Sequence, residues 1–227
     1  MGFVYLIFDL DETLYPRQAG LMREIGWRIE RWVQENLRLT PEEAAALRRI
    51  YLQRYGTTLA GLLAEGRVDV DAYLAFVHDV PVERWIRPNP ALARMLDGIP
   101  LCKVVFTNAT SEHGWRVLKA LGVADRFEDV IGIREVGLRS KPNLESYRWV
   151  LKRLGVPGTA CILVDDRPMN LRPAKQLGMT TVLVDGVPEE GVDFVVKDVL
   201  AVGPLVARLL RGKQRKGESE RTSLRSS

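Results

Sequence analysis

Two carboxylates follow an apolar run close to the start of the chain. Residues 3–8 are apolar or aromatic, and Asp9 and Asp11 come shortly after them, two positions apart. Side chains two apart on an extended strand share one face, so both carboxylates would point the same way. Like charges in a partly dry site repel each other strongly unless a cation or a catalytic role compensates. The pair therefore indicates a cation site or acid–base chemistry at a strand end.

Two further apolar runs also end in polar side chains. One is followed by Thr107 and Asn108, and the other ends in Asp165 and Asp166. Lys141 lies just before a predicted helix start, where its positive charge and free backbone N–H groups both favour a phosphate. At adjacent strand ends these groups would form a site of carboxylate oxygens beside donors for a phosphoryl group.

The composition of this predicted site favours Mg²⁺, because oxygen ligands that leave room for a substrate suit a hard cation. The sequence has no cluster of histidines and cysteines of the kind that binds zinc. It also has neither a Walker A loop nor a G-x-G-x-x-G fingerprint. Phosphoryl transfer without a bound nucleotide cofactor is the chemistry that remains.

Alternating strands and helices must position these residues. Continuous apolar runs predict buried parallel strands at residues 3–10, 101–107, 161–165, 180–184 and 194–196. Apolar residues at three-to-four spacing predict helices at residues 111–121, 143–154 and 170–177. This alternation predicts an α/β fold with a doubly wound, Rossmann-like parallel sheet.

A helical insert interrupts the alternation between the first two predicted strands. An apolar stripe from Leu21 to Leu37 predicts one helix, and a capping box at Thr40 opens a second that runs to about Tyr55. Two shorter helices are expected at residues 58–64 and 69–78. We therefore expect an α/β core of residues 1–15 and 89–210, a small all-helical cap of residues 16–88 above the carboxyl ends of the strands, and a disordered basic tail of residues 211–227.

Charge and composition exclude several other functions. The net charge of +4 lies wholly in the last seventeen residues, which hold six basic and two acidic side chains. A neutral body does not favour specific binding to nucleic acid or to a membrane surface. No apolar run approaches the roughly 20 residues that span a bilayer, and the two cysteines, Cys102 and Cys161, both fall in predicted strands. We expect a cytoplasmic protein that is a monomer or homodimer and binds a small phosphorylated substrate.

Taken together, the motifs resemble those of the haloacid dehalogenase superfamily of aspartate-nucleophile phosphatases. The superfamily's four motifs match, in the right order, Asp9-x-Asp11-x-Thr13, Thr107-Asn108, Lys141 and Asp165-Asp166. The insert resembles the superfamily's helical cap. More narrowly, the chain is similar to the pyrimidine 5′-nucleotidase branch in residues 8–16, in residues 55–62 and in Val164-Asp165-Asp166 followed by Asn170.

The resemblance implies a role for each motif residue. Asp9 would be the nucleophile that forms an aspartyl-phosphate, and Asp11 the general acid and base. Mg²⁺ would be held by Asp9, the Asp11 backbone carbonyl and Asp166, with Asp165 and Asn170 supporting these ligands. Thr107, Asn108 and Lys141 would bind the phosphate.

The same resemblance predicts the substrate, a pyrimidine nucleoside 5′-monophosphate. Alternatives are a phosphoglycolate or sugar-phosphate phosphatase, a phosphomutase, or an inactive phosphate-binding scaffold. Hydrolytic dehalogenation is disfavoured, because the dehalogenases of the superfamily lack the second aspartate, Asp11. Arg167 departs from the branch, which usually has a small residue there, and its side chain either contacts phosphate or faces solvent.

Overall fold

A six-stranded parallel sheet forms the centre of the computed structural model, which describes residues 2–212. The strands are β1 (Tyr5–Phe8), β2 (Cys102–Phe106), β3 (Asp129–Ile131), β4 (Cys161–Asp165), β5 (Thr180–Val184) and β6 (Phe194–Val196). Their order, β3-β2-β1-β4-β5-β6, places β1 beside β4 in the middle of the sheet, where the order reverses. Ligands of such sheets bind outside the carboxyl ends at this point. The predicted α/β fold with a doubly wound parallel sheet is confirmed.

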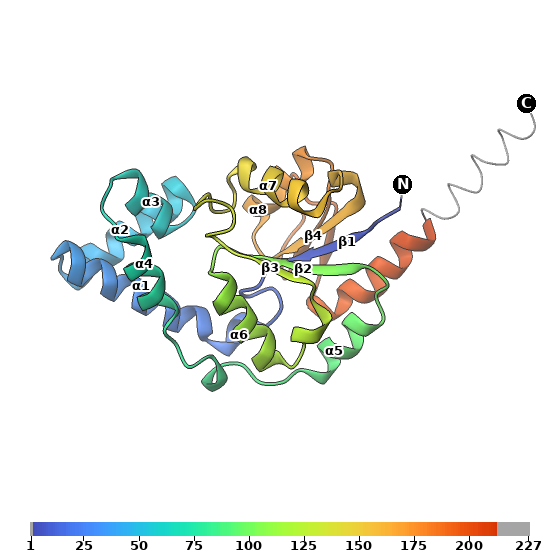
Figure 1. Ribbon diagram of the computed structural model, residues 1–227, viewed down its shortest axis with the longest axis horizontal. Coiled ribbons are helices and arrows are strands. Elements are labelled where there is room, and N and C mark those ends of the chain that lie inside the picture. The colour runs from blue at the N-terminus through green and yellow to red at the C-terminus, as the bar shows by residue number, and fades with distance from the viewer. Residues whose placement is uncertain (1, 213–227) are drawn as a thin grey trace, which may run out of the picture.

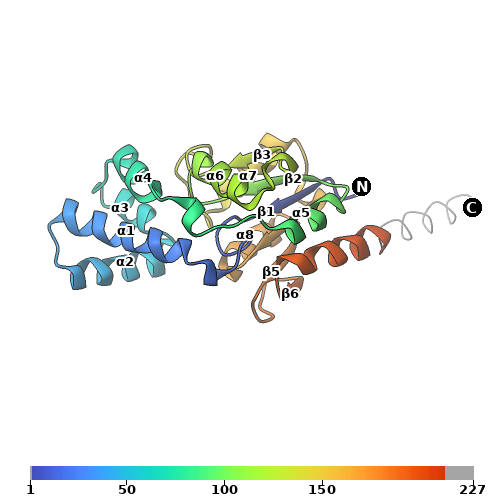
Figure 2. The same ribbon diagram turned by 90° about the horizontal axis from the view of Figure 1, so that it is seen from below.

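Helices cover both faces of the sheet. On one face lie α5 (Pro90–Asp97), α6 (Ser111–Leu121) and a last helix of residues 202–212, and on the other lie α7 (Leu144–Leu154) and α8 (Pro168–Gln176) (Figures 1 and 2). Each helix turns an apolar stripe to the strands, and most residues of β1 to β5 are buried between the two layers, whereas the edge strand β6 is partly exposed. The core therefore holds the strand ends in fixed register.

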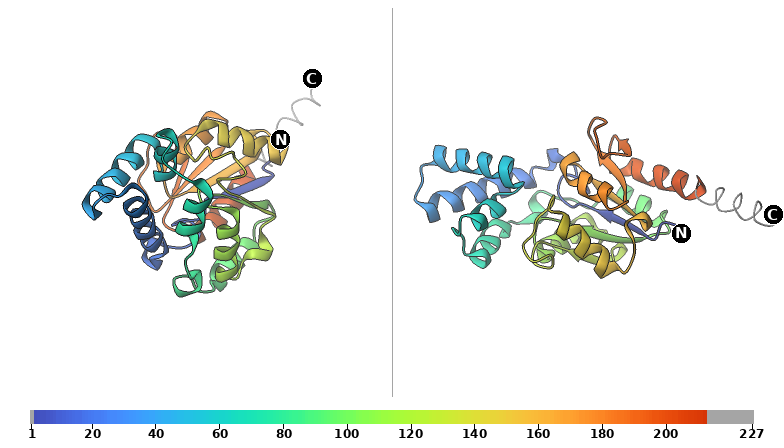
Figure 3. Two further views of the ribbon diagram at one scale, coloured as in Figure 1. Left: turned by 60° about the vertical axis from the view of Figure 1, so that its left-hand side comes forward. Right: turned by 90° about the horizontal axis from the view of Figure 1, so that it is seen from above.

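Four of the five α-helices between β1 and β2 form a separate group at one end of the molecule (Figures 1 and 3). They are α1 (Leu21–Leu37), α2 (Pro41–Tyr55), α3 (Thr58–Ala64) and α4 (Val70–His78), and we call them the insert helices. The predicted capping box is present, since Thr40 Oγ1 accepts from the Glu43 N–H at 3.2 Å and Glu43 Oε2 accepts from the Thr40 N–H at 2.8 Å. The insert helices lie beyond the carboxyl end of β1, where the predicted site residues gather.

Two contacts tie the insert helices to the loop before α7. Thr57 and Ser140 are joined by a hydrogen bond between their hydroxyls, with 3.2 Å between the oxygens. Gly56 ends α2 in the left-handed conformation with φ +82°, and a Cβ at this position would lie 2.9 Å from Pro142 Cδ. The close approach of α2 to this loop therefore depends on a residue without a side chain.

Four elements differ from the sequence-based expectation. The first strand ends at Phe8 instead of residue 10, because the chain turns at Glu12, which has φ +60°. Neither β3, with three residues, nor α5 was predicted. The chain is helical through residue 212, so the first two residues of the predicted tail are ordered, and residues 213–227 lie outside the described part.

None of the described helices has the length and apolar character needed to cross a membrane.

Substitution of Gly56 tests the contact between α2 and the loop before α7. Gly56→Ala should lower the free energy of unfolding by about 2–4 kcal/mol, because it adds left-handed backbone strain and a clash with Pro142. Gly66→Ala is the control, since Gly66 also has positive φ but a Cβ added there would meet nothing within 4 Å. Gly66→Ala should lower the free energy of unfolding by only about 1–2 kcal/mol. Equal losses in urea unfolding would show that the Pro142 contact contributes nothing.

Candidate active site

Neighbouring strands place the predicted site residues at one edge of the sheet. Asp9 follows β1, Thr107 follows β2, and Asp165 is the last residue of β4. Phe8 pairs with Val164 across the ladder, and the Asp9 N–H donates to the Val164 carbonyl oxygen at 2.8 Å. Backbone pairing therefore brings the Asp9 and Asp165 carboxylates together despite their like charge.

The buried ammonium of Lys141 compensates this repulsion. Its Nζ donates to Asp9 Oδ1 at 2.7 Å and to Asp165 Oδ2 at 2.8 Å, and the side chain is only 1% exposed. Burial by itself lowers the pKa of Lys141, but attraction by Asp165 and Asp9 outweighs it and raises the pKa, so the ammonium stays charged. Lys141 was predicted as a phosphate ligand, and in the structure it also joins two carboxylates.

Asn108 holds the loop that carries Lys141. Its Oδ1 accepts from the Lys141 N–H at 2.7 Å, and its Nδ2 donates to the Lys141 carbonyl oxygen at 3.1 Å. Both ends of the side-chain amide therefore fix the loop before α7 to the end of β2. Asn108 was predicted to bind phosphate. In the structure it lies in the wall of the cavity, and its side-chain hydrogen bonds are with the backbone of Lys141.

Asp165 is surrounded by donors. Besides Lys141, its oxygens accept from the Arg167 N–H at 2.9 Å and from Asn170 Nδ2 at 2.9 and 3.0 Å. Asn170 is fixed in turn, because the Tyr147 hydroxyl donates to the Asn170 backbone carbonyl oxygen at 2.6 Å. These bonds hold the Asp165 carboxylate in one orientation and leave it little capacity to bind another group.

Asp11 is held by groups that sequence reasoning missed. Tyr15 donates its hydroxyl proton to Asp11 Oδ1 at 2.5 Å, and His113 Nε2 lies 4.0 Å from the same oxygen. Burial raises the pKa of Asp11, while the hydrogen bond from Tyr15 opposes the rise. The pairing with Tyr15 could have been suspected, because a tight turn after β1 brings residues four apart together. No local pattern points to His113, which comes from α6.

Two imidazoles lie behind Asp11, the buried ring of His113 and the half-buried ring of His78. His78 at the end of α4 and His113 on α6 have ring centroids 4.8 Å apart, so they join the insert helices to the core. Burial lowers the pKa of both rings to about 4, which keeps them neutral near pH 7. Neither ring nitrogen of His113 has a hydrogen-bond partner among residues 2–212.

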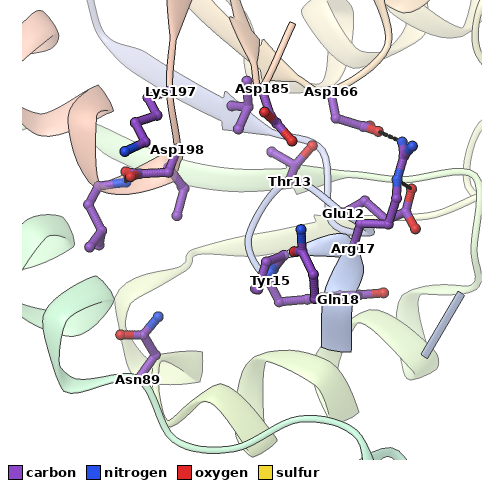
Figure 4. A pocket seen from close by; sticks show the side chains of 14 residues that line it. Glu12, Thr13, Tyr15, Arg17, Gln18, Asn89, Asp166, Asp185, Lys197 and Asp198 are labelled. Carbon is purple, nitrogen blue, oxygen red and sulfur yellow. Dashed lines mark hydrogen bonds and ion pairs between the residues drawn. The ribbon is translucent and has the colours of Figure 1, made fainter. Parts of the chain in front are cut away.

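Asp166 is the acidic residue with the weakest compensation. The Arg17 guanidinium lies between Asp166 and Glu12 (Figure 4). Its Nη2 is 3.7 Å from Asp166 Oδ2, whereas its Nε is 2.9 Å from Glu12 Oε2. Burial, with repulsion from Asp165, raises the pKa of Asp166 to about 7. One carboxylate oxygen from each of Asp9, Asp165 and Asp166 lies within 4.8 Å of the other two. An all-oxygen set with excess negative charge fits a divalent cation of the Mg²⁺ type.

Thr107 and Thr13 complete the floor of the site. Thr107 is buried, and its Oγ1 accepts from the Ala109 N–H at 3.0 Å, which leaves its hydroxyl proton to be donated elsewhere. Thr13 donates to Asp9 Oδ2 at 3.3 Å. Together with Lys141, Thr13 fixes both oxygens of the Asp9 carboxylate.

A cavity of about 530 Å³ opens above these residues. Side chains from both the core and α2 line it, including Asp9, Asp11, Arg48, Lys141 and Arg167. A smaller cavity of about 160 Å³ shares Asp11, Arg48 and Arg167 with it and extends between the insert helices and the core. The first cavity therefore contains the acidic residues, and the second offers space for the rest of a bound molecule.

Fold and site together define a hydrolase of the α/β class with a carboxylate centre at the switch point of its sheet. The chain belongs to the haloacid dehalogenase-like hydrolases, whose family model matches residues 5–178. The superfamily resemblance seen in the sequence is thereby confirmed.

Similar proteins include phosphatases. The chain is 29% identical over 225 residues to "Glyceraldehyde 3-phosphate phosphatase" of Methanocaldococcus jannaschii, covering 90% of this chain and 97% of that protein. It is 26% identical over 208 residues to "Phosphate metabolism protein 8" of Saccharomyces cerevisiae, covering 84% of this chain but only 65% of the yeast protein. A crystal structure of a phosphatase of this superfamily from Thermococcus onnurineus has the same fold, with a TM-score of 0.61 at 18% identity over 90% of this chain and 98% of that one.

Removal of the Lys141 charge should destabilise the protein in a pH-dependent way. Lys141→Met leaves two buried carboxylates unpaired and should lower the free energy of unfolding at pH 8 by about 3–5 kcal/mol. Burial raises the pKa of Asp9 well above its usual range, and Lys141 opposes this rise. In the variant that opposition is lost, so the folded-state pKa of Asp9 rises further above its unfolded value. Stability is then gained at low pH and lost as pH rises through the folded-state pKa, so the deficit should shrink at pH 5.

Urea unfolding in EDTA at both pH values measures this deficit. Lys152→Met, which changes an exposed lysine on α7, should have little effect at either pH. A Lys141→Met deficit that is the same at pH 5 and pH 8 would show that lost packing, and not lost charge, causes the destabilisation.

Proposed function

We propose that the protein is a Mg²⁺-dependent phosphomonoesterase that works through an aspartyl-phosphate on Asp9. The observation that carries this proposal is the position of Asp9, whose carboxylate is fixed by Lys141 and Thr13 on the floor of an open cavity. Asp11 lines the same cavity. The phosphatases among the similar proteins support this chemistry.

In the first step, an Asp9 oxygen attacks phosphorus in line, and the bond from phosphorus to the ester oxygen breaks. Asp11 gives its proton to the departing alkoxide, which leaves as an alcohol. In the second step, Asp11 takes a proton from a water molecule as that water attacks phosphorus. The bond from phosphorus to Asp9 breaks, and inorganic phosphate leaves.

Other residues orient the phosphoryl group. Lys141 and Thr107 present an ammonium and a hydroxyl to its non-bridging oxygens, and Asn108 acts by fixing the Lys141 backbone. Asp9, the Asp11 backbone carbonyl and Asp166 would hold Mg²⁺. Asp165 and Asn170 would support them indirectly, because Asn170 fixes Asp165 and Asp165 holds the Lys141 ammonium that binds Asp9. When bound, the ion reduces the repulsion between the Asp9 carboxylate and the phosphate.

Two substrate classes fit the site. The motif resemblance favours a pyrimidine nucleoside 5′-monophosphate. The second class, a short phosphate ester, fits the small volume between the insert helices and the core. In the described part of the chain no tryptophan lines either cavity, so neither offers an indole on which a base could stack. The name of the methanogen relative also gives a short phosphate ester as its substrate. A panel containing UMP, CMP, phosphoglycolate, glyceraldehyde 3-phosphate and glucose 1-phosphate distinguishes them by phosphate release.

Metal removal and loss of the nucleophile should each abolish turnover. With EDTA, phosphate release should stop and should return when Mg²⁺ is added in excess. Asp9→Asn should reduce release to background, because an amide cannot form the acyl-phosphate, while the thermal melting curve remains cooperative. Retained activity in the folded Asp9→Asn protein would contradict the covalent mechanism.

The leaving group should reveal the acid role of Asp11 and the positioning role of Tyr15. Asp11→Asn should reduce turnover of an alkyl phosphate by roughly 10²–10⁴-fold and that of p-nitrophenyl phosphate much less, because p-nitrophenolate needs little protonation. Tyr15→Phe should show the same pattern with a smaller loss, roughly tenfold for the alkyl ester, since it removes one charge-assisted hydrogen bond.

Tyr51→Phe is the matched control for Tyr15→Phe. Tyr51 makes an equally short bond, 2.5 Å, to Glu65 within the insert helices and away from Asp11. Tyr51→Phe should leave the ratio of the alkyl phosphate rate to the p-nitrophenyl phosphate rate unchanged. If Tyr15→Phe lowers both rates equally, the tyrosine supports the fold and does not position the acid.

A further inference from the structure

Two arginines lie on the part of the site that would face the leaving group. Arg48 comes from α2, and Arg167 from the turn after β4. Both line the larger cavity and also the smaller one between the insert helices and the core. A leaving group that extends from a phosphate on Asp9 toward the insert helices would therefore pass between an arginine of the insert and an arginine of the core.

The Arg48 guanidinium is incompletely paired. Its Nη1 donates to Glu30 Oε1 at 2.7 Å, but its Nε is buried with no hydrogen-bond partner among the described residues. A buried donor without a partner is costly, and a ligand that accepts its hydrogen bond would remove the cost. The neighbouring helix makes room for the group, since a Cβ on Gly26 would lie 2.8 Å from Arg48 Nη2.

Arg167 is also without an anionic partner. The described part of the chain has no ion pair to its guanidinium, whose Nη2 contacts the Met169 sulfur at 3.0 Å. The side chain is half-buried, while its backbone N–H is fixed by Asp165. The sequence left open whether Arg167 contacts a phosphate or faces solvent. In the structure its half-buried side chain lines both cavities, which fits contact with a bound anion better than full exposure to solvent.

A third polar group lies in the same space. Thr58 begins α3, and its Oγ1 is buried with no hydrogen-bond partner among residues 2–212. The surrounding wall is otherwise largely apolar, with Ile25 and Leu52 among its members. Unpaired donors in an apolar wall are typical of sites that fix a polar ligand group at one position.

Charge decides the nature of that group. The phosphoryl end of the site already has Lys141, with carboxylates positioned to hold a divalent cation. Binding the phosphoryl group of a monoester therefore does not require the two further guanidinium groups that lie beyond Asp11. Guanidinium groups favour carboxylate and phosphate oxygens, because their planar N–H donors match the geometry of these anions.

We infer that Arg48 and Arg167 form a subsite for a second anionic group, so that the substrate is a short phosphate monoester whose leaving group itself carries a carboxylate or a phosphate. This inference rests on the proposed phosphomonoesterase function and adds the substrate class. It favours short acidic esters over nucleoside monophosphates, whose leaving group is neutral. Arg48 and Arg167 are thus specificity-determining residues on opposite sides of the cavity.

Rates for esters of similar size but different charge test the subsite. Phosphoglycolate supplies a carboxylate, 1,3-propanediol bisphosphate supplies a phosphate, and n-propyl phosphate supplies neither. The wild-type protein with Mg²⁺ should hydrolyse at least one of the two anionic esters with kcat/KM at least roughly tenfold above that of n-propyl phosphate. Whichever anionic ester is preferred identifies the group that the subsite binds.

Substitutions then locate the preference. Arg48→Met and Arg167→Met should each lower kcat/KM for the preferred anionic ester by roughly tenfold, mainly through KM, and leave n-propyl phosphate within about twofold. Arg49→Met, which changes the exposed neighbour on α2, is the control and should change neither rate. Arg48→Met also removes the ion pair with Glu30, so thermal melting accompanies the kinetics, and Arg167→Met tests the subsite without affecting that pair.

The outcomes separate the two proposals. The wild type could hydrolyse p-nitrophenyl phosphate and n-propyl phosphate with kcat/KM values equal to those for both anionic esters. In that case the subsite is wrong and the phosphomonoesterase function stands. Equal losses on charged and neutral esters in both variants would also overturn the subsite. If no ester is hydrolysed, the phosphomonoesterase function fails and the subsite fails with it.

Discussion

The ion pairs of Lys141 with Asp9 and Asp165 are the interaction on which the rest of the site depends. Parallel pairing of β1 with β4 brings two carboxylates to one point of the sheet, and burial makes their repulsion severe. A buried ammonium between them, at 2.7 and 2.8 Å, makes that arrangement stable and keeps the Asp9 carboxylate in place. The same contacts would be lost at a large free-energy cost if Lys141 moved, because two buried charges would then be unpaired.

The position of Lys141 depends on parts of the chain that are distant in sequence. Asn108 binds both backbone groups of Lys141, which links its loop to the end of β2. The same loop contacts the insert helices through Ser140 and Thr57 and through the close approach of Gly56 to Pro142. The placement of the insert helices over the cavity is therefore coupled to the lysine that holds Asp9, the proposed nucleophile.

Sequence reasoning predicted what local pattern and strand topology determine. Asp9, Thr107 and Asp165 follow buried parallel strands, whose carboxyl ends must share an edge, so their proximity could be expected. The capped start of α2 at Thr40 was equally readable. β3 was missed because Asp129 leaves only two apolar residues in it, whereas β6, of the same length, is wholly apolar. The place of β3 in the sheet comes from its pairing with β2.

Contacts made by tertiary packing could not be predicted in this way. The 4.0 Å approach of His113 to Asp11 joins α6 to the turn after β1, and Arg48 reaches the site only because α2 packs over it. The contacts of Asn108 with the Lys141 backbone were equally hidden, since an amide at a strand end binds whichever loop the fold brings to it. Residue type and spacing thus indicated the groups of the proposed phosphoryl site, whereas the arginines of the proposed subsite could be found only in the three-dimensional structure.

The most direct test of the account is to trap the phosphorylated protein. Protein mixed with Mg²⁺ and a ³²P-labelled ester that it hydrolyses is quenched in acid within the first turnover and digested, and the labelled peptide is sequenced by mass spectrometry. The account predicts label on the peptide that contains Asp9, as an acyl-phosphate that hydroxylamine cleaves. Turnover without label on Asp9, or with hydroxylamine-resistant label on another residue, would contradict it.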